Sequence, residues 1–145
     1  MRHLVPVLTA GLMAVGFGTS FADKTSRSGN TAALDGYCPV AYVAMHKAVK
    51  GDPEVSLDYE GKHYLFVNVD AKKMFEAAPS KYQVAYDGWC ATAMSTGKKL
   101  GSNSEIFTVT DGVTYLFSGA DAKKMFDASP AAVIKKAGAQ WASLR

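Results

Sequence analysis

The sequence DAKKMF occurs twice in this chain, at residues 70–75 and again at residues 121–126. The likeness extends to both sides, because residues 59–79 align with residues 110–130 without a gap. Each copy begins with an acidic residue followed by glycine, Glu60-Gly61 or Asp111-Gly112, between runs rich in β-branched and aromatic residues. That pattern is typical of a β-hairpin. The repeat therefore predicts two tandem ββα units, each an antiparallel hairpin followed by a short helix.

The repeated segment also predicts how each short helix is built. Asp70 and Asp121 are expected to cap the first turn. Ala71, Met74 and Phe75 follow at the spacing of one apolar helix face, and the second copy repeats that spacing. Methionine at such positions usually fills gaps in a core. We therefore interpret DAKKMF as scaffold and look for function where the copies differ.

Three further helical segments are predicted outside the repeat. Residues 39–49 begin with Pro39, which suits the first turn of a helix. Residues 89–97 end at Gly97, a residue typical of helix C-termini. Residues 129–144 place Ser129 as an N-cap before Pro130. Together these patterns predict an α+β fold in which the two tandem ββα units and the flanking helices share one core.

The first 22 residues have the layout of a secretory signal peptide. Arg2 precedes a short apolar run, and Ser20 and Ala22 stand at the small-residue positions of a cleavage site before Asp23. Residues 23–33 contain no large apolar side chain and are expected to form a flexible leader. Residues 34–145 then form a single domain, which we expect in the periplasm and not in a membrane. The formal net charge of +3 is too small and too scattered to indicate a nucleic-acid partner.

Two cysteines, Cys38 and Cys90, stand outside the aligned copies. Both are expected at the start of a helix, where the helix dipole favours the thiolate form. Three interpretations are open. The cysteines form a disulfide, as is common in exported proteins; they bind a thiophilic metal such as copper or zinc; or they are a redox-active thiol pair, although the CxxC spacing of oxidoreductases is absent.

Few other residues could complete a metal site with the cysteines. Met94 lies four residues after Cys90, on the same helix face, and its thioether would suit Cu(I). His46 and His63 are the other candidate ligands. Each has a simpler interpretation, since Met94 suits a core position and the two histidines suit exposed ones. The chain contains no HxH or HExxH motif to support a metal site by spacing.

No catalytic constellation stands out, so the chain is not predicted to be an enzyme. A nucleophile elbow and a phosphate-binding loop are both missing. Aromatic residues gather around the cysteine segments, where they could line a pocket for a small ligand or a protein partner; they are Tyr37, Tyr42, Tyr82, Tyr86 and Trp89.

The segment LDGYCPVAYVAMHKAVKGDPEVSLDYEGKHYLFVNVDAKKMFEAAPSKY, residues 34–82, resembles the YHS domain family. Its match lies in a Gly-Tyr-x-Pro-Val-Ala-Tyr start, a Tyr-x-Gly-x-x-Tyr-x-Phe hairpin and a closing Pro-x-x-Tyr. Residues 85–100, AYDGWCATAMSTGKKL, resemble the Gly-Gly-Tyr-Cys-Ala segment of exported members. The family name is associated with heavy-metal-binding and metal-transport proteins, so the resemblance implies a metal-related role.

The chain departs from the metal-binding relatives at the ligands themselves. Those relatives carry cysteines where this chain has Ala41 and, after the hairpin, Val67 and Asn68. Cys38 stands where exported relatives often have aspartate, and Cys90 matches their cysteine. The leading hypothesis is therefore an exported metal-binding module that holds copper through Cys38 and Cys90. The alternative is a disulfide-stapled, non-enzymatic domain that binds a protein or a small ligand without metal.

Overall fold

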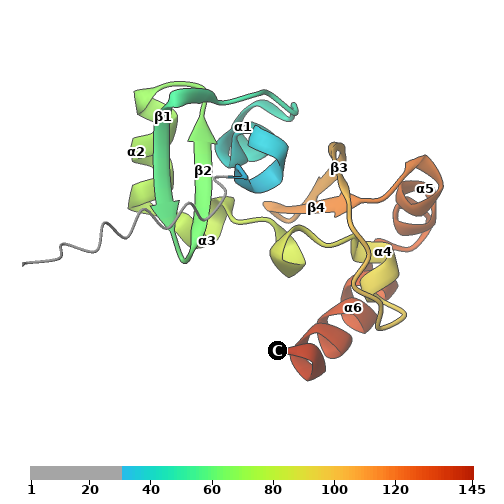
Figure 1. The fold of residues 1–145 in the computed structure, drawn as a ribbon. Coiled ribbons are helices and arrows are strands. Elements are labelled where there is room, and N and C mark those ends of the chain that lie inside the picture. The colour runs from blue at the N-terminus through green and yellow to red at the C-terminus, as the bar shows by residue number, and fades with distance from the viewer. Residues whose placement is uncertain (1–30) are drawn as a thin grey trace, which may run out of the picture.

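The structure, a computed structural model, describes residues 31–145. The predicted signal peptide and nearly all of the predicted leader lie outside the described residues. The chain forms a first unit, residues 33–82, and a second unit, residues 85–144, which lie side by side in Figure 1. In order, the elements are η1 (Ala33–Gly36), α1 (Pro39–Met45), β1 (Asp52–Tyr59), β2 (Lys62–Phe66), α2 (Val69–Ala77), α3 (Pro79–Tyr82), η2 (Ala85–Gly88), α4 (Ala91–Met94), β3 (Asn103–Thr110), β4 (Val113–Phe117), α5 (Ala120–Ala128) and α6 (Pro130–Leu144).

Each unit contains the predicted antiparallel hairpin. β1 pairs with β2 and β3 pairs with β4, in two separate two-stranded sheets. The turn residues Glu60-Gly61 and Asp111-Gly112 have positive φ, the conformation that tight hairpin turns require. The strand pairing shifts register at the same place in both hairpins, just after Asp52 or Asn103. The α+β class and the tandem ββα units are thus confirmed.

The helices of the repeat begin differently from the prediction. The N-cap of α2 is Asn68, whose side-chain oxygen accepts a hydrogen bond from the Ala71 backbone N–H at 2.8 Å. The N-cap of α5 is Gly119, which has no side chain to cap with. Asp70 and Asp121 are not the caps, because each already lies inside the first helical turn. There their charge still complements the positive end of the helix dipole.

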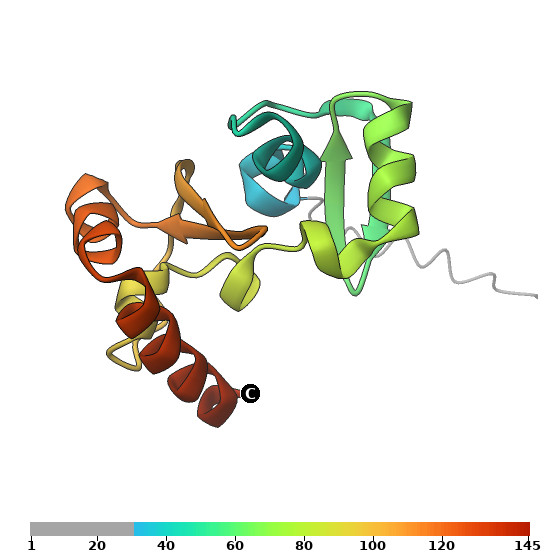
Figure 2. The ribbon, with the colours of Figure 1, turned by 180° about the vertical axis from the view of Figure 1, so that it is seen from behind.

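The buried apolar residues form two clusters, one in each unit, instead of the single shared core expected. Phe75 of α2 packs against Tyr64 at a ring-centroid distance of 5.0 Å. Its counterpart Phe126 packs against Tyr115 at 5.1 Å. Figure 2 shows α2 and α5 at opposite ends of the molecule, each on its own hairpin. Each ββα unit therefore buries its own aromatic centre.

The repeated methionines lie outside these clusters, so the prediction that they pack in the core is wrong. Met74 is 43% exposed and Met125 is 64% exposed. Both precede the buried phenylalanine by one residue, which turns them about 100° around the helix away from it. A two-stranded sheet is narrow and covers one stripe of the helix, and that stripe passes through Phe75 or Phe126.

Of the flanking helices, α6 spans nearly the predicted residues, whereas α1 and α4 are shorter than predicted. Pro39 and Pro130 start α1 and α6. α1 ends at Met45 because His46 adopts a left-handed conformation with φ of 51°. α4 ends at Met94, three residues before the predicted end at Gly97. Ser129 occupies the N-cap position of α6, but its side chain makes no capping hydrogen bond.

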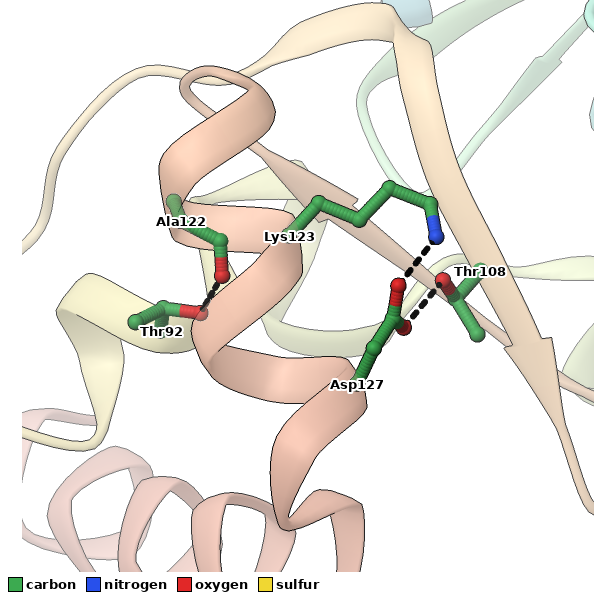
Figure 3. Close-up of polar contacts among 5 residues, drawn as sticks. All are labelled: Thr92, Thr108, Ala122, Lys123 and Asp127. Atoms are coloured by element: carbon green, nitrogen blue, oxygen red, sulfur yellow. Dashed lines mark hydrogen bonds and ion pairs between the residues drawn. The ribbon is translucent and has the colours of Figure 1, made fainter.

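Polar links fix α5 of the second unit in place (Figure 3). The Thr92 hydroxyl of α4 donates to the Ala122 carbonyl oxygen at 2.7 Å. The Thr108 hydroxyl of β3 donates to the Asp127 carboxylate at 3.1 Å, and Lys123 donates to the other oxygen of that carboxylate. The corresponding residues of the first unit include Val40 and Leu57, so the second unit replaces some apolar packing with hydrogen bonds.

The two units meet where α1 packs on the start of β3. Tyr42 of α1 is fully buried, and its hydroxyl donates to the Ser104 carbonyl oxygen at 2.6 Å. Its ring also packs edge-on against Phe107, with centroids 4.8 Å apart. Closer to solvent, the Tyr37 hydroxyl donates to the Glu105 carboxylate. These contacts join the first unit to β3 of the second.

Candidate functional site

The two cysteines occupy equivalent positions of the two units. Cys38 is the N-cap residue of α1, and Cys90 is the N-cap residue of α4. Each backbone N–H donates to a carbonyl oxygen on the loop that follows the helix: Cys38 to Val49 at 2.8 Å, and Cys90 to Leu100 at 2.9 Å. The structural repeat is therefore longer than the aligned copies and includes both cysteines.

The structure does not gather the two thiols into one cluster. Both are free and fully buried, Cys38 in the apolar cluster of the first unit and Cys90 in that of the second. Buried thiols in apolar surroundings behave as small hydrophobic side chains. A copper or zinc ion held jointly by both sulfurs stays a prediction, and a double-variant experiment described below tests it.

The remaining predicted ligands lie apart from each other. Met94 is fully buried at the end of α4. His46 is exposed at the end of α1. His63 is half-buried on β2, and its Nδ1 lies 2.6 Å from the carboxylate of Asp58 on the paired strand. Within residues 31–145, no three histidine, cysteine or acidic side chains come together as a metal site would require.

A left-handed turn precedes each cysteine. Leu34 and Asp35 in η1, like Tyr86 and Asp87 in η2, have φ between 52° and 57°. For residues other than glycine this conformation costs on the order of 1 kcal/mol each. Both turns pack against the second strand of their own hairpin. The strained turn of the second unit directs Tyr86 and Asp87 toward the junction between the units.

A cavity of about 260 Å³ lies at this junction. We call it the junction cavity; the residues that matter for the argument are Lys62, Tyr64, Tyr86, Asp87, Trp141 and Arg145. They come from the first hairpin, from η2 and from the end of α6. Small-molecule sites occur preferentially at such meeting points of structural units.

Two polar bridges join the walls of the junction cavity. The Lys62 ammonium lies 2.7 Å from the Asp87 carboxylate, which links the first hairpin to η2. The Gln83 side-chain amide donates to the Glu60 carboxylate at 2.9 Å, which links the connecting segment to the hairpin turn. Both pairs are near solvent, so each stabilises the fold only weakly. They do set the relative position of the two walls.

The aromatic walls carry neutral phenol groups. Burial, opposed in part by a hydrogen bond to Gln83, raises the pKa of Tyr64 to about 12. Burial, and to a lesser degree Tyr115, raises the pKa of Tyr86 to about 12. The Tyr86 ring stands edge-on to Trp141, with centroids 6.2 Å apart. Both phenols therefore keep their protons at any physiological pH.

A second cavity, of about 220 Å³, lies on another side of the junction. Asp35 and Asp87 of the two left-handed turns line it, together with Trp89 and Ser104. The Ser104 hydroxyl donates to the Asp35 carboxylate at 2.8 Å. Of the aromatic residues noted in the sequence, Tyr86 thus lines the first cavity and Trp89 the second, whereas Tyr42 and Tyr82 are buried.

Sequence reasoning missed most of the junction cavity. Tyr86 was among the candidate ligand-pocket residues, but Lys62, Trp141 and Arg145 were not. Lys62 is far from Trp141 and Arg145 in the chain, and none of the three belongs to a motif, so only the fold brings the end of α6 and β2 to one cavity.

Comparisons with protein-family models, with curated proteins and with solved structures found no match for this chain. The resemblance to the YHS family therefore stays a prediction. None of the helices described in residues 31–145 has the length and apolar character needed to cross a membrane.

Proposed function

We propose that this protein is a non-enzymatic binding domain that holds a small carboxylate-bearing molecule in the junction cavity. The observation that carries the proposal is the Arg145 guanidinium, which lines the cavity beside aromatic side chains and has no hydrogen-bonding or ionic partner among the described residues. Among the other charged side chains of the cavity, Lys62 is paired with Asp87, and the Glu60 carboxylate accepts a hydrogen bond from Gln83.

The guanidinium suits a carboxylate chemically. It offers several N–H donors in a planar fork, which matches the two oxygens of a carboxylate. Its central carbon lies 5.5 Å from the centre of the Trp141 ring, within the range of a cation–π interaction, which favours this position of the guanidinium. A guanidinium held in this way loses less conformational entropy on binding than a free one.

The rest of the ligand would lie against the aromatic walls. Tyr86 and Trp141 present ring edges and faces, and the neutral phenol of Tyr64 can donate a hydrogen bond. The Tyr86 hydroxyl already donates to the Ile134 carbonyl oxygen, at 3.4 Å. A cavity of this size takes a molecule of about one ring and its substituent. The ligand class is therefore a small, flat molecule that carries a carboxylate.

Binding is proposed instead of catalysis because of the chemistry of the lining. No histidine or cysteine is among the residues that line the junction cavity, and its lysine is engaged by Asp87. Ser80 lines the cavity too, but no hydrogen bond joins its hydroxyl to a basic side chain among the described residues, so an activated nucleophile is not offered there.

Benzoate, with benzamide as its uncharged counterpart, provides the test. The chain has two tryptophans, and Trp141 lines the junction cavity while Trp89 lines the other. In a titration followed by the indole N–H resonances, we expect benzoate to shift Trp141 and leave Trp89 in place. Benzamide should shift neither.

Two variants identify the group that binds the anion. Arg145→Gln should abolish the benzoate response. Lys99→Gln should preserve it, because Lys99 also lies over Trp141, at 5.3 Å, but does not line the cavity. An equal response to benzoate and benzamide, or a response at Trp89, would contradict the proposal.

A further inference from the structure

A second surface of the first unit has a different chemistry. A groove of about 200 Å³ runs between α1 and α2. Its walls are mostly apolar, and the residues that matter here are Met45, Met74, Asn68 and Asp70. We call it the methionine groove. It shares no residue with the junction cavity.

Both methionines of the groove are open to solvent. Met45 is 50% exposed and Met74 is 43% exposed. A single exposed methionine needs no explanation. Two of them that line one groove, from two different helices, place two thioether sulfurs beside the same space.

We propose that the methionine groove binds a soft monovalent metal ion, Cu(I) or Ag(I), through the thioethers of Met45 and Met74. Thioethers are uncharged, polarisable donors that favour such ions over harder ones. Methionine has three rotatable side-chain bonds, so each thioether can adjust its position in the groove that both residues line. The inference is independent of the ligand proposed for the junction cavity.

Asp70 supplies the only carboxylate among the groove residues and would balance the charge of the ion. The side-chain oxygen of Asn68 is less available, because it caps α2 by accepting the Ala71 N–H. One carboxylate cannot satisfy Ca²⁺, which takes six to eight oxygens. No histidine or cysteine lines the groove, so the ligands that Zn²⁺ prefers are not offered there.

The second unit contains half of this arrangement. Met125 occupies the position of Met74 in the repeat and is 64% exposed. The residue equivalent to Met45 is Gly97, which lies beyond the end of α4. The second unit therefore presents one thioether where the first presents two, and Met125 serves as an internal control.

Silver titration of protein labelled at the methionine methyl groups tests the site. We expect Ag(I) to shift the methyl resonances of Met45 and Met74 and to leave those of Met94 and Met125 unchanged. Met45→Leu and Met74→Leu should each weaken Ag(I) binding about tenfold or more, as loss of a metal-site residue commonly does. Met125→Leu should bind as the unaltered protein does, and Zn²⁺ should shift none of the four.

Three outcomes would overturn the proposal. One is an equal loss of affinity in Met74→Leu and Met125→Leu. Another is a first shift at Met94, which lies one helical turn from Cys90 and would report silver at the buried thiol. The third is a groove that responds to an apolar peptide but not to silver, which would make it a peptide-docking surface. Leucine keeps the volume of methionine closely enough that all three variants should fold.

Discussion

The hydroxyl of Tyr42 in the first unit donates a hydrogen bond to the carbonyl oxygen of Ser104 in the second, at 2.6 Å and away from solvent. Replacing Tyr42 by phenylalanine leaves that buried carbonyl without its partner. We expect Tyr42→Phe to lower the free energy of unfolding by about 1–2 kcal/mol. Urea unfolding measures this change in the free energy of unfolding. Tyr37→Phe is the control, because the hydrogen bond from Tyr37 to Glu105 is exposed and its loss should cost under about 0.5 kcal/mol. Equal losses would contradict the assignment of Tyr42 as the buried link.

Replacing two threonines of the second unit by valine should change the free energy of unfolding in opposite directions. Thr114 is 1% exposed, and its hydroxyl has no hydrogen-bond partner within the described residues. Thr114→Val should therefore raise the free energy of unfolding by about 1 kcal/mol. Thr92→Val removes the bond to Ala122 shown in Figure 3 and should lower it by a similar amount. Urea unfolding of both variants tests this expectation. Changes of the same sign in the free energy of unfolding would contradict it.

Stability should fall at high pH because several tyrosines have raised pKa values, among them Tyr64 and Tyr86. In the unfolded chain a tyrosine ionises near pH 10, whereas the pKa of both Tyr64 and Tyr86 is raised to about 12 in the fold. The folded state then holds more protons between these values, so their stabilising contribution is complete below about pH 10 and declines as the pH rises toward 12.

Unfolding measured at several pH values above neutrality checks this expectation. Lysines also lose their charge in this range, so the informative quantity is a difference between proteins. Tyr64→Phe should flatten the decline in part relative to the unaltered protein, because one of the phenols with a raised pKa is gone. An unchanged slope would mean that Tyr64 ionises as readily in the fold as outside it.

The two cysteines should act independently of each other. Each is buried in a different cluster, so Cys38→Ala and Cys90→Ala should each cost about 1–2 kcal/mol of unfolding free energy. The double variant should cost their sum, because separate sites are additive. A metal or a disulfide shared by both sulfurs would instead make either single variant about as costly as the double. The mass of the intact native protein also shows whether the two cysteines are free or joined.

The sequence predicts local structure here much better than it predicts the site. Hairpin turns such as Asp111-Gly112 and helix starts such as Pro39 depend on the conformations available to a few adjacent residues. Asp70 and Asn68 are both residue types that cap helices well, so the sequence alone does not show which of them caps α2. The choice depends on the residue at which β2 ends and the chain turns into the helix. Met74 was expected in a core because helical spacing identifies an apolar face but not how wide a sheet will cover it.

The site could not be predicted because it depends on how the units pack. Tyr86 and Arg145 reach one cavity only through the direction in which α6 leaves α5. The segments ALDGYC and AYDGWC show that the two cysteines are equivalent. The stretch between each cysteine and its hairpin differs in length by one residue between the units, so an alignment of the repeat without gaps does not include the cysteines.

The last helix, α6, packs on the part of the second unit that corresponds to the docking face of the first. Through Tyr42, the first unit presents its α1 face to the next unit; the equivalent residue of the second unit is Met94, buried in α4 where α6 packs. Where the first unit has the four-residue α3, the second has the fifteen-residue α6. The face of the second unit that corresponds to the docking face of the first is thus covered by a helix of the same unit.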